Sequence, residues 1–187
     1  GGGSGEESTK VTNVISEASP DEPIEFGIYN DLIPITDVEI FVNEELSNVK
    51  VSIEALDEKP SSVNTPDGIV SEYMEISLIN FDDSSIEEAE VSFYVLDSWV
   101  DDNNIDLDKV LLQRYDGSWE ELDTSFTASI DDKHYFNADV TGFSYFVITG
   151  EEVSEEVSEE PEEIAHIFEE ITGDDVIESA PEEEEEE

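Results

Sequence analysis

The sequence has no cysteine, few basic residues and no long apolar run, and each shortage excludes a class of protein. Without cysteine the chain forms no disulfide, thiolate nucleophile or cysteine metal cluster. Six Lys and Arg residues stand against 53 Asp and Glu residues, a net charge of -47. We therefore expect no binding to nucleic acid, whose phosphates need clustered basic side chains. No run reaches about 18 apolar residues, so we expect no transmembrane segment.

Histidine is scarce too, which argues against catalysis based on histidine. The sequence has two histidines, and only His134 lies outside the acidic C-terminal segment. We predict that His134 is an exposed strand residue rather than the base of a nucleophilic serine. A catalytic pair of carboxylates, as in glycoside hydrolases, cannot be singled out among 53 acidic residues. The sequence therefore predicts that the chain is not an enzyme.

The distribution of acidic residues divides the chain into three parts. Residues 151–187 hold 19 of the 53 acidic residues and neither Lys nor Arg, which predicts an acidic low-complexity tail. Residues 1–9 are interpreted as a glycine-rich linker, and residues 10–150 as one folded domain. This domain is also acidic, and its self-repulsion weakens at about 1 M salt, where the screening length is about 3 Å. A saline setting therefore suits the chain.

Apolar and polar residues alternate through most of residues 10–149, the pattern of half-buried strands. Val49, Val51 and Ile53, for example, share one face of a predicted strand. Turn residues such as Asp116-Gly117 separate the alternating segments. Segment 143–148 is apolar on both faces, which predicts a central strand covered on both sides. The pattern as a whole predicts an all-β fold, an antiparallel β-sandwich of about ten strands.

Two short helices are predicted beside these strands. Residues 98–104 follow a strand, with Asp97 or Ser98 at the N-cap position and Trp99 packed onto the sandwich. Residues 161–172, within the tail, have apolar side chains at the spacing of one helix face: Ile164, Ile167, Phe168 and Ile171. An isolated helix of about 12 residues is marginal in water, so we predict that it folds only against the body of the chain or a partner, with these four residues as the docking contact.

Four blocks of the sequence resemble one protein family. They are Leu46–Pro60, Ser98-Trp99 followed by 103–106, Arg114–Trp119 and Gly142–Phe146. In this order they are similar to the archaeal PGF-pre-PGF domain family, and the resemblance extends over about residues 33–150. The glycine-rich segment ahead of the domain also fits the usual arrangement of that family.

This resemblance implies an exported protein on the surface of an archaeal cell, with other cell-envelope proteins or copies of itself as partners. Family members usually carry a linker and a PGF-CTERM sorting tail after the domain, and no enzymatic activity is established for them. This sequence has no Pro-Gly-Phe motif followed by an apolar span. We therefore expect either a fragment or processed form, or a protein that is attached in another way.

One acidic loop has the spacing of a calcium site. Calcium takes six to eight oxygen ligands, which alternate residues of a loop can supply. The candidate ligands are Asp102, Asn104, Asp106 and Asp108. Leu107 and Gln113, however, occupy the places where an EF-hand has Gly and Glu. The plainer interpretation is a helix end and turn, so no cofactor is predicted, and calcium is left open.

Aromatic residues offer a second binding hypothesis, a platform for carbohydrate. The candidates are Trp99, Tyr115, Trp119, Tyr135, Phe143, Tyr145 and Phe146. Large aromatic side chains also dominate the cores of β-sandwiches, and we predict that core packing is their main role. The sequence thus favours a non-enzymatic archaeal surface module with a structural or assembly role. The alternative is an extracellular binding module for carbohydrate or calcium.

Overall fold

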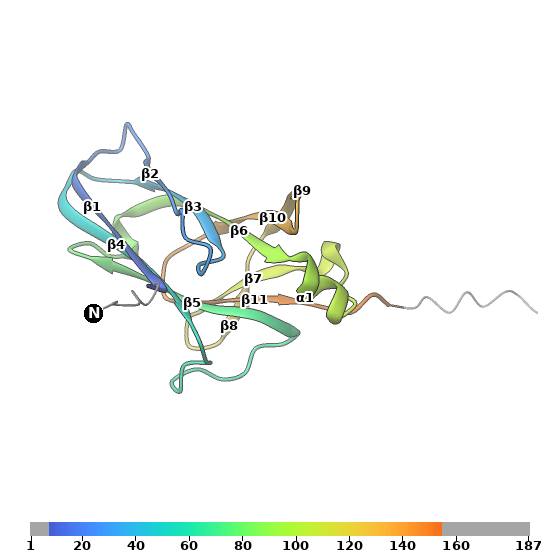
Figure 1. Ribbon diagram of the computed structural model, residues 1–187. Coiled ribbons are helices and arrows are strands. Elements are labelled where there is room, and N and C mark those ends of the chain that lie inside the picture. Colours follow the sequence, from blue (N-terminus) through green and yellow to red (C-terminus); the bar gives the residue numbers. More distant parts are fainter. Residues whose placement is uncertain (1–7, 155–187) are drawn as a thin grey trace, which may run out of the picture. The chain divides into compact units, whose positions relative to one another are not determined.

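A computed structural model of the protein describes residues 8–154, which form two antiparallel β-sheets (Figure 1). The six-stranded sheet has, in spatial order, β1 (Lys10–Ala18), β4 (Leu46–Leu56), β5 (Ile69–Ile79), β11 (Tyr145–Gly150), β7 (Leu111–Tyr115) and β8 (Trp119–Glu121). The five-stranded sheet has β2 (Ile24–Gly27), β3 (Ile35–Val42), β6 (Ile86–Leu96), β10 (Lys133–Val140) and β9 (Thr124–Ile130). This architecture confirms the predicted all-β sandwich.

The core lies between the two sheets and is built from the alternating apolar residues. Val51 and Ile53 of β4 are fully buried, whereas Lys50 and Glu54, which alternate with them on the opposite face of the strand, are half-buried. On the facing sheet, the Phe93 ring of β6 stacks on Phe136 of β10, with the ring centroids 5.5 Å apart. Burial of such side chains removes apolar area from water at about 25 cal/mol per Å², which is the main force that holds the sheets together.

The last strand, β11, occupies the centre of its sheet as predicted. It pairs with β5 on one side and β7 on the other. Phe146 and Ile148 belong to the core between the sheets, and Val147 on the opposite face is also fully buried. The loop between β4 and β5 lies over that opposite face, since Gln113 and Trp119 donate hydrogen bonds to the carbonyls of Asp67 and Asn64.

One α-helix, α1 (Asp97–Asp102), is present in the described part of the chain, close to the predicted range. The predicted N-cap is wrong, because Leu96 occupies that position and no side chain caps the helix. The carboxylate of Asp97 instead contacts His134 on β10. Trp99 packs onto the sandwich as predicted, and its Nε1 donates to the carbonyl of Val70 over 3.2 Å. Two short 3-10 helices, η1 (Asp83–Ser85) and η2 (Leu107–Lys109), complete the fold.

The only arginine of the sequence, Arg114 on β7, is buried at one end of the sandwich. Its Nη2 lies 2.8 Å from Oδ2 of Asp83, and Oδ1 of the same carboxylate accepts the backbone N–H of Phe143 over 2.9 Å. Gly142 lies against this ion pair. A single carboxylate thus ties three distant connections of the chain together: the β5–β6 connection, β7 and the β10–β11 connection.

The tail hypotheses concern residues that the structure does not describe. The first compact unit ends at Ser154, and the predicted helix at 161–172, with Ile164, Ile167, Phe168 and Ile171, lies outside the described residues. Their docking role stays a prediction. Within residues 8–154, no helix has the length and apolar character needed to cross a membrane.

Candidate functional site

The four candidate calcium ligands lie at the end of α1 and in the turn that follows. Asp102 is the last residue of the helix, and Asn104 adopts a left-handed backbone conformation with φ of 49°. The carboxylate of Asp106 accepts the backbone N–H of Asp108 over 3.0 Å and so caps η2. The plainer interpretation, a helix end and turn, therefore describes the local geometry well.

The carboxylates of this loop do not converge on a common point where a metal ion could bind. Across residues 8–154, no three Asp, Glu or His side chains converge in an arrangement that suits a metal ion. The backbone of the loop is also occupied, because the carbonyl of Asn104 accepts the N–H of Val153 over 2.8 Å. Calcium binding by Asp102, Asn104, Asp106 and Asp108 stays a prediction, without support from the geometry.

His134 lies on β10 but is less exposed than predicted, since only 12% of its side chain is accessible. Its Nδ1 lies 2.7 Å from Oγ of Ser129, directly across the β9–β10 hairpin. Its Nε2 lies 3.0 Å from Oδ1 of Asp97, the first residue of α1. Sequence analysis missed this contact because Asp97 is 37 residues away and becomes a neighbour only through the pairing of β10 with β6.

Serine, histidine and aspartate in one hydrogen-bonded chain are also the residue types of many hydrolases. A nucleophilic serine additionally requires a pocket for substrate and donors for the oxyanion. The best-formed hollows of residues 8–154 are lined by side chains other than Ser129 and His134. We interpret the three residues as a tie that holds the β9–β10 hairpin against the start of α1.

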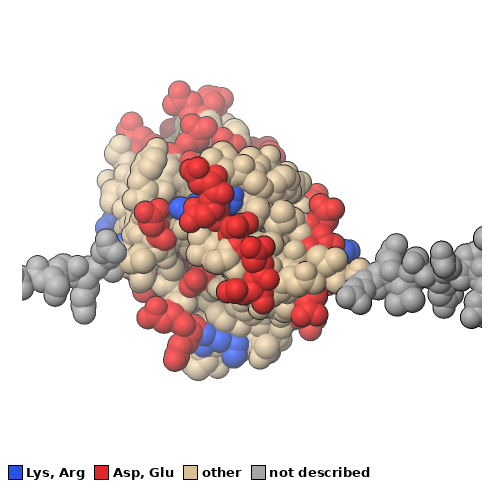
Figure 2. Space-filling view, turned by 45° about the vertical axis from the view of Figure 1, so that its right-hand side comes forward, with Lys and Arg blue, Asp and Glu red and all other residues tan. Residues whose placement is uncertain are grey.

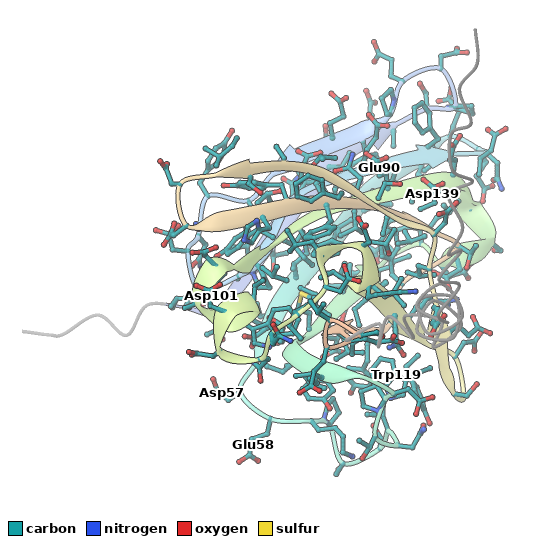
Figure 3. All side chains as sticks on the ribbon, turned by 90° about the vertical axis from the view of Figure 1, so that its right-hand side faces the viewer. Asp57, Glu58, Glu90, Asp101, Trp119 and Asp139 are labelled. Atoms are coloured by element: carbon teal, nitrogen blue, oxygen red, sulfur yellow. The ribbon has the colours of Figure 1, made fainter. Side chains whose placement is uncertain are left out.

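A row of four carboxylates crosses the outer face of the five-stranded sheet. In the strand register, Glu25 of β2 lies opposite Glu39 of β3, Glu39 opposite Glu90 of β6, and Glu90 opposite Asp139 of β10. We call these four residues the carboxylate ladder; Figure 3 labels Glu90 and Asp139 on their adjacent strands. Like charges directly opposite each other in a sheet are destabilising, so this arrangement costs stability that screening by salt restores.

The charges of the carboxylate ladder contribute to a raised pKa at one member, Glu39, and at Asp37, which lies two residues before it on β3. The pKa of Glu39 is raised above its ordinary value of 4.5, chiefly because its carboxyl hydrogen-bonds with that of Glu25. Partial burial and the negative charges of Glu25, Glu90 and Asp37 raise the pKa further. The pKa of Asp37 is raised by burial first and then by the charge of Glu25. The sheet thus favours the protonated forms of these side chains.

Comparison with known proteins supplies no residue roles for this site. No family model matches the chain. No curated protein and no solved structure matches it either. The resemblance to the PGF-pre-PGF domain family therefore rests on the four sequence blocks alone.

The seven aromatic residues proposed for a carbohydrate platform do not lie together. Phe143 and Phe146 are buried in the core, and Trp99, a residue of α1, packs against that core. Tyr135 lies on the other sheet, where its ring is 6.0 Å from that of Tyr94. Core packing is thus the role of only part of the set.

Two of the three remaining aromatic side chains, Tyr115 and Trp119, meet on the outer face of the six-stranded sheet, and the third, Tyr145, is half-buried at the start of β11. The Trp119 ring is 5.2 Å from Tyr115 and 6.3 Å from Tyr73, a residue that sequence analysis did not single out. All three side chains are half-buried. Trp119, labelled in Figure 3, also donates to the carbonyl of Asn64 over 2.7 Å. This aromatic cluster (Tyr73, Tyr115 and Trp119) holds the β4–β5 loop on the sheet and leaves part of each ring in contact with solvent.

We expect the substitution Glu39→Gln to stabilise the protein by about 0.5 kcal/mol at neutral pH and low salt. It removes a negative charge that lies directly between those of Glu25 and Glu90. Folded Glu39 takes up a proton at a higher pH than unfolded Glu39 does, so the wild type gains stability as the pH falls through the raised pKa. The advantage of the variant should therefore shrink on acidification towards 4.5, and also in about 1 M salt. Urea denaturation at several pH values measures both effects.

Glu58→Gln is the matched control, because Glu58 lies exposed in the β4–β5 loop, away from the carboxylate ladder (Figure 3). It should leave the denaturation midpoint unchanged. A Glu39→Gln protein that is less stable than the wild type at neutral pH would contradict the prediction, as would an advantage that persists undiminished at high salt.

Proposed function

We propose that this chain is a non-enzymatic structural or assembly module of an archaeal cell surface. The resemblance to the PGF-pre-PGF domain family supplies the location. The fold supports this role, because its two sheets pack into one core without any disulfide and present anionic side chains outward (Figure 2). Such a surface stays hydrated in concentrated salt.

The carboxylate ladder is the observation that carries this proposal. Four acidic side chains in direct register destabilise the sheet unless dissolved ions screen them. At about 0.1 M salt the screening length of about 10 Å is long compared with the spacing of about 5 Å between adjacent strands. At about 1 M it falls to about 3 Å, below that spacing. A module with this surface is best suited to the salty medium outside a cell.

Labelling of intact cells tests the proposed location. A membrane-impermeant reagent that modifies lysine should label the chain on intact cells, and the chain should fractionate with the envelope. Labelling only after lysis, together with recovery from the soluble fraction, would overturn the proposal. Electron microscopy of the purified chain in high and low salt then separates the two roles: regular filaments or sheets indicate assembly, and dispersed particles indicate a spacer.

A second candidate function, carbohydrate binding, is favoured by the aromatic cluster on the outer face of the six-stranded sheet. Aromatic rings that are partly open to solvent supply flat apolar surface, and the Trp119 indole has the largest of the three ring systems. If the envelope contains a glycan that this cluster binds, Trp119→Ala should weaken that binding by about tenfold or more. Calorimetry with envelope polysaccharide measures it.

Tyr135→Ala is the control for this experiment, since Tyr135 is a half-buried aromatic residue on the other sheet. Circular dichroism must show that the Trp119→Ala protein remains folded, because the substitution also removes the hydrogen bond to Asn64. Absence of heat with every envelope polysaccharide, or equal loss of binding in both variants, would eliminate this candidate.

A further inference from the structure

The five-stranded sheet has an open edge at β9. This strand pairs with β10 on one side, and it is the last strand in the spatial order of its sheet. Along Ser125–Ile130, the backbone hydrogen bonds of the described residues all run to β10. Within residues 8–154, no strand pairs with the outward N–H and C=O groups of this segment, which are the groups through which an edge strand accepts a further strand.

The β9 edge lacks the charges with which proteins usually protect such edges. The four edge strands of the two sheets are β1, β8, β2 and β9. β1 carries Lys10 and Glu17, β2 carries Glu25, and β8 carries Glu120 and Glu121. β9, with the sequence TSFTASI, is the only one of the four without a charged residue. It is also longer than β2 and β8, which have four and three residues against its seven.

Two apolar side chains are exposed on this uncharged edge. Phe126 is 46% exposed and Ile130 is 56% exposed, although each lies on a strand. The β9–β10 pair contains one irregularity of register, a bulge beside Phe126, which bends the strand at that point. On both sides of it, at residues 124–126 and 128–130, the pairing with β10 is regular. Pairing with a further strand would both satisfy the backbone groups and cover these side chains.

Charge decides which partner this edge suits. A cationic partner is drawn to carboxylates, and β9 has none. A second copy of this chain carries a net charge of -47 and is repelled by every carboxylate-bearing surface. Two copies approach each other at least cost where carboxylates are fewest. The seven residues of β9 carry none, and the nearest in the sequence are the exposed Asp123 at one end and Asp131 and Asp132 at the other, whose mutual repulsion salt screens.

We propose that β9 pairs antiparallel with β9 of a second copy around a two-fold axis, so that the two five-stranded sheets join into one continuous sheet. This inference rests on the proposed function and names the partner and the surface of that assembly. Because each copy is strongly anionic, the dimer forms at high ionic strength, where repulsion over longer distances is screened, and dissociates at low ionic strength.

Sedimentation equilibrium of the full chain in about 0.1 M and about 1 M salt tests the proposal. The wild type should be monomeric at low salt and dimeric at high salt. Ser125→Glu places a carboxylate on the β9 edge of both copies and should weaken the dimer by about tenfold or more. Ser16→Glu adds the same charge at an exposed position of β1, the other long edge strand, and should dimerise like the wild type.

Hydrogen exchange provides a second measurement on the same proteins. The amides of residues 125–130 that face outward should be protected in the high-salt dimer and exchange rapidly in the Ser125→Glu protein. A wild-type chain that stays monomeric at high salt overturns the proposal, as does equal weakening by Ser125→Glu and Ser16→Glu. A monomer whose β9 amides are protected, and become unprotected in Phe168→Glu, would show instead that the tail of the same chain covers the edge.

These outcomes separate the dimer from the proposed function. A chain that labels on intact cells but never dimerises is a surface module without this contact. A chain that dimerises through β9 but resides inside the cell retains the contact and loses the location.

Discussion

The substitution Asp83→Ala is expected to destabilise the protein by about 3 kcal/mol. It leaves the buried Arg114 guanidinium without its 2.8 Å partner and the backbone N–H of Phe143 without an acceptor. Breaking a fully buried ion pair costs about 3 to 5 kcal/mol. We expect the lower end of that range because the Asp83 side chain is 39% exposed and water partly replaces it. Equilibrium denaturation in urea measures the loss.

Asp116→Ala provides the control, because Asp116 is the other acidic neighbour of Arg114. Its carboxylate lies 3.8 Å from Nη1 and is 67% exposed, so its removal should cost about 0.5 kcal/mol or less. The double substitution Asp83→Ala with Arg114→Met removes both charges and should recover part of the lost stability. If Asp83→Ala and Asp116→Ala have equal effects, the ion pair does not tie the three connections as described.

Gly142→Ala is expected to be equally damaging, by about 3 kcal/mol, for a steric reason. A Cβ atom at this position would overlap Oδ2 of Asp83 and lie 2.9 Å from Nη2 of Arg114. Neither side chain can move away without lengthening the ion pair, so the substitution strains the β10–β11 connection or separates the charges. A lower midpoint of thermal unfolding, together with lower stability in urea, measures the effect.

Gly27→Ala is the control, because it makes the same substitution at a glycine where a Cβ atom has room. Gly27 lies on β2, and the three atoms nearest to a Cβ there all belong to the side chain of Tyr29, which is fully exposed and free to turn. Since alanine is favoured over glycine within a strand, this substitution should be neutral or slightly stabilising. A Gly142→Ala protein as stable as Gly27→Ala would refute the close packing at the Arg114–Asp83 pair.

The fold was predictable from the sequence because side chains alternate with a period of two along each strand. Val51, Ile53 and Phe93 all face the core as the alternation requires. The central position of β11 was predictable from its two apolar faces, since only a covered strand tolerates both. Local chemistry was less reliable: the N-cap of α1 is Leu96, because the carboxylate of Asp97 is engaged by His134 instead.

The surface features were not predictable, because they depend on which strands become neighbours. Glu25, Glu39, Glu90 and Asp139 are unremarkable acids in the sequence and form the carboxylate ladder only through the order β2-β3-β6-β10. Likewise, nothing in TSFTASI distinguishes an edge strand from an internal one. The burial of Arg114 was also missed, since an arginine in an alternating segment is expected to face solvent.

The central place of β11 determines when the six-stranded sheet can be completed during synthesis of the chain. Its partners β5 and β7 are both synthesised before it, yet they do not pair with each other. Until residues 145–150 leave the ribosome, the nascent chain therefore has two half-sheets with open edges, and Gly142 has not yet reached Asp83. Completion of the sheet is consequently a late, long-range step, of the kind that slows folding and prolongs the need for chaperones.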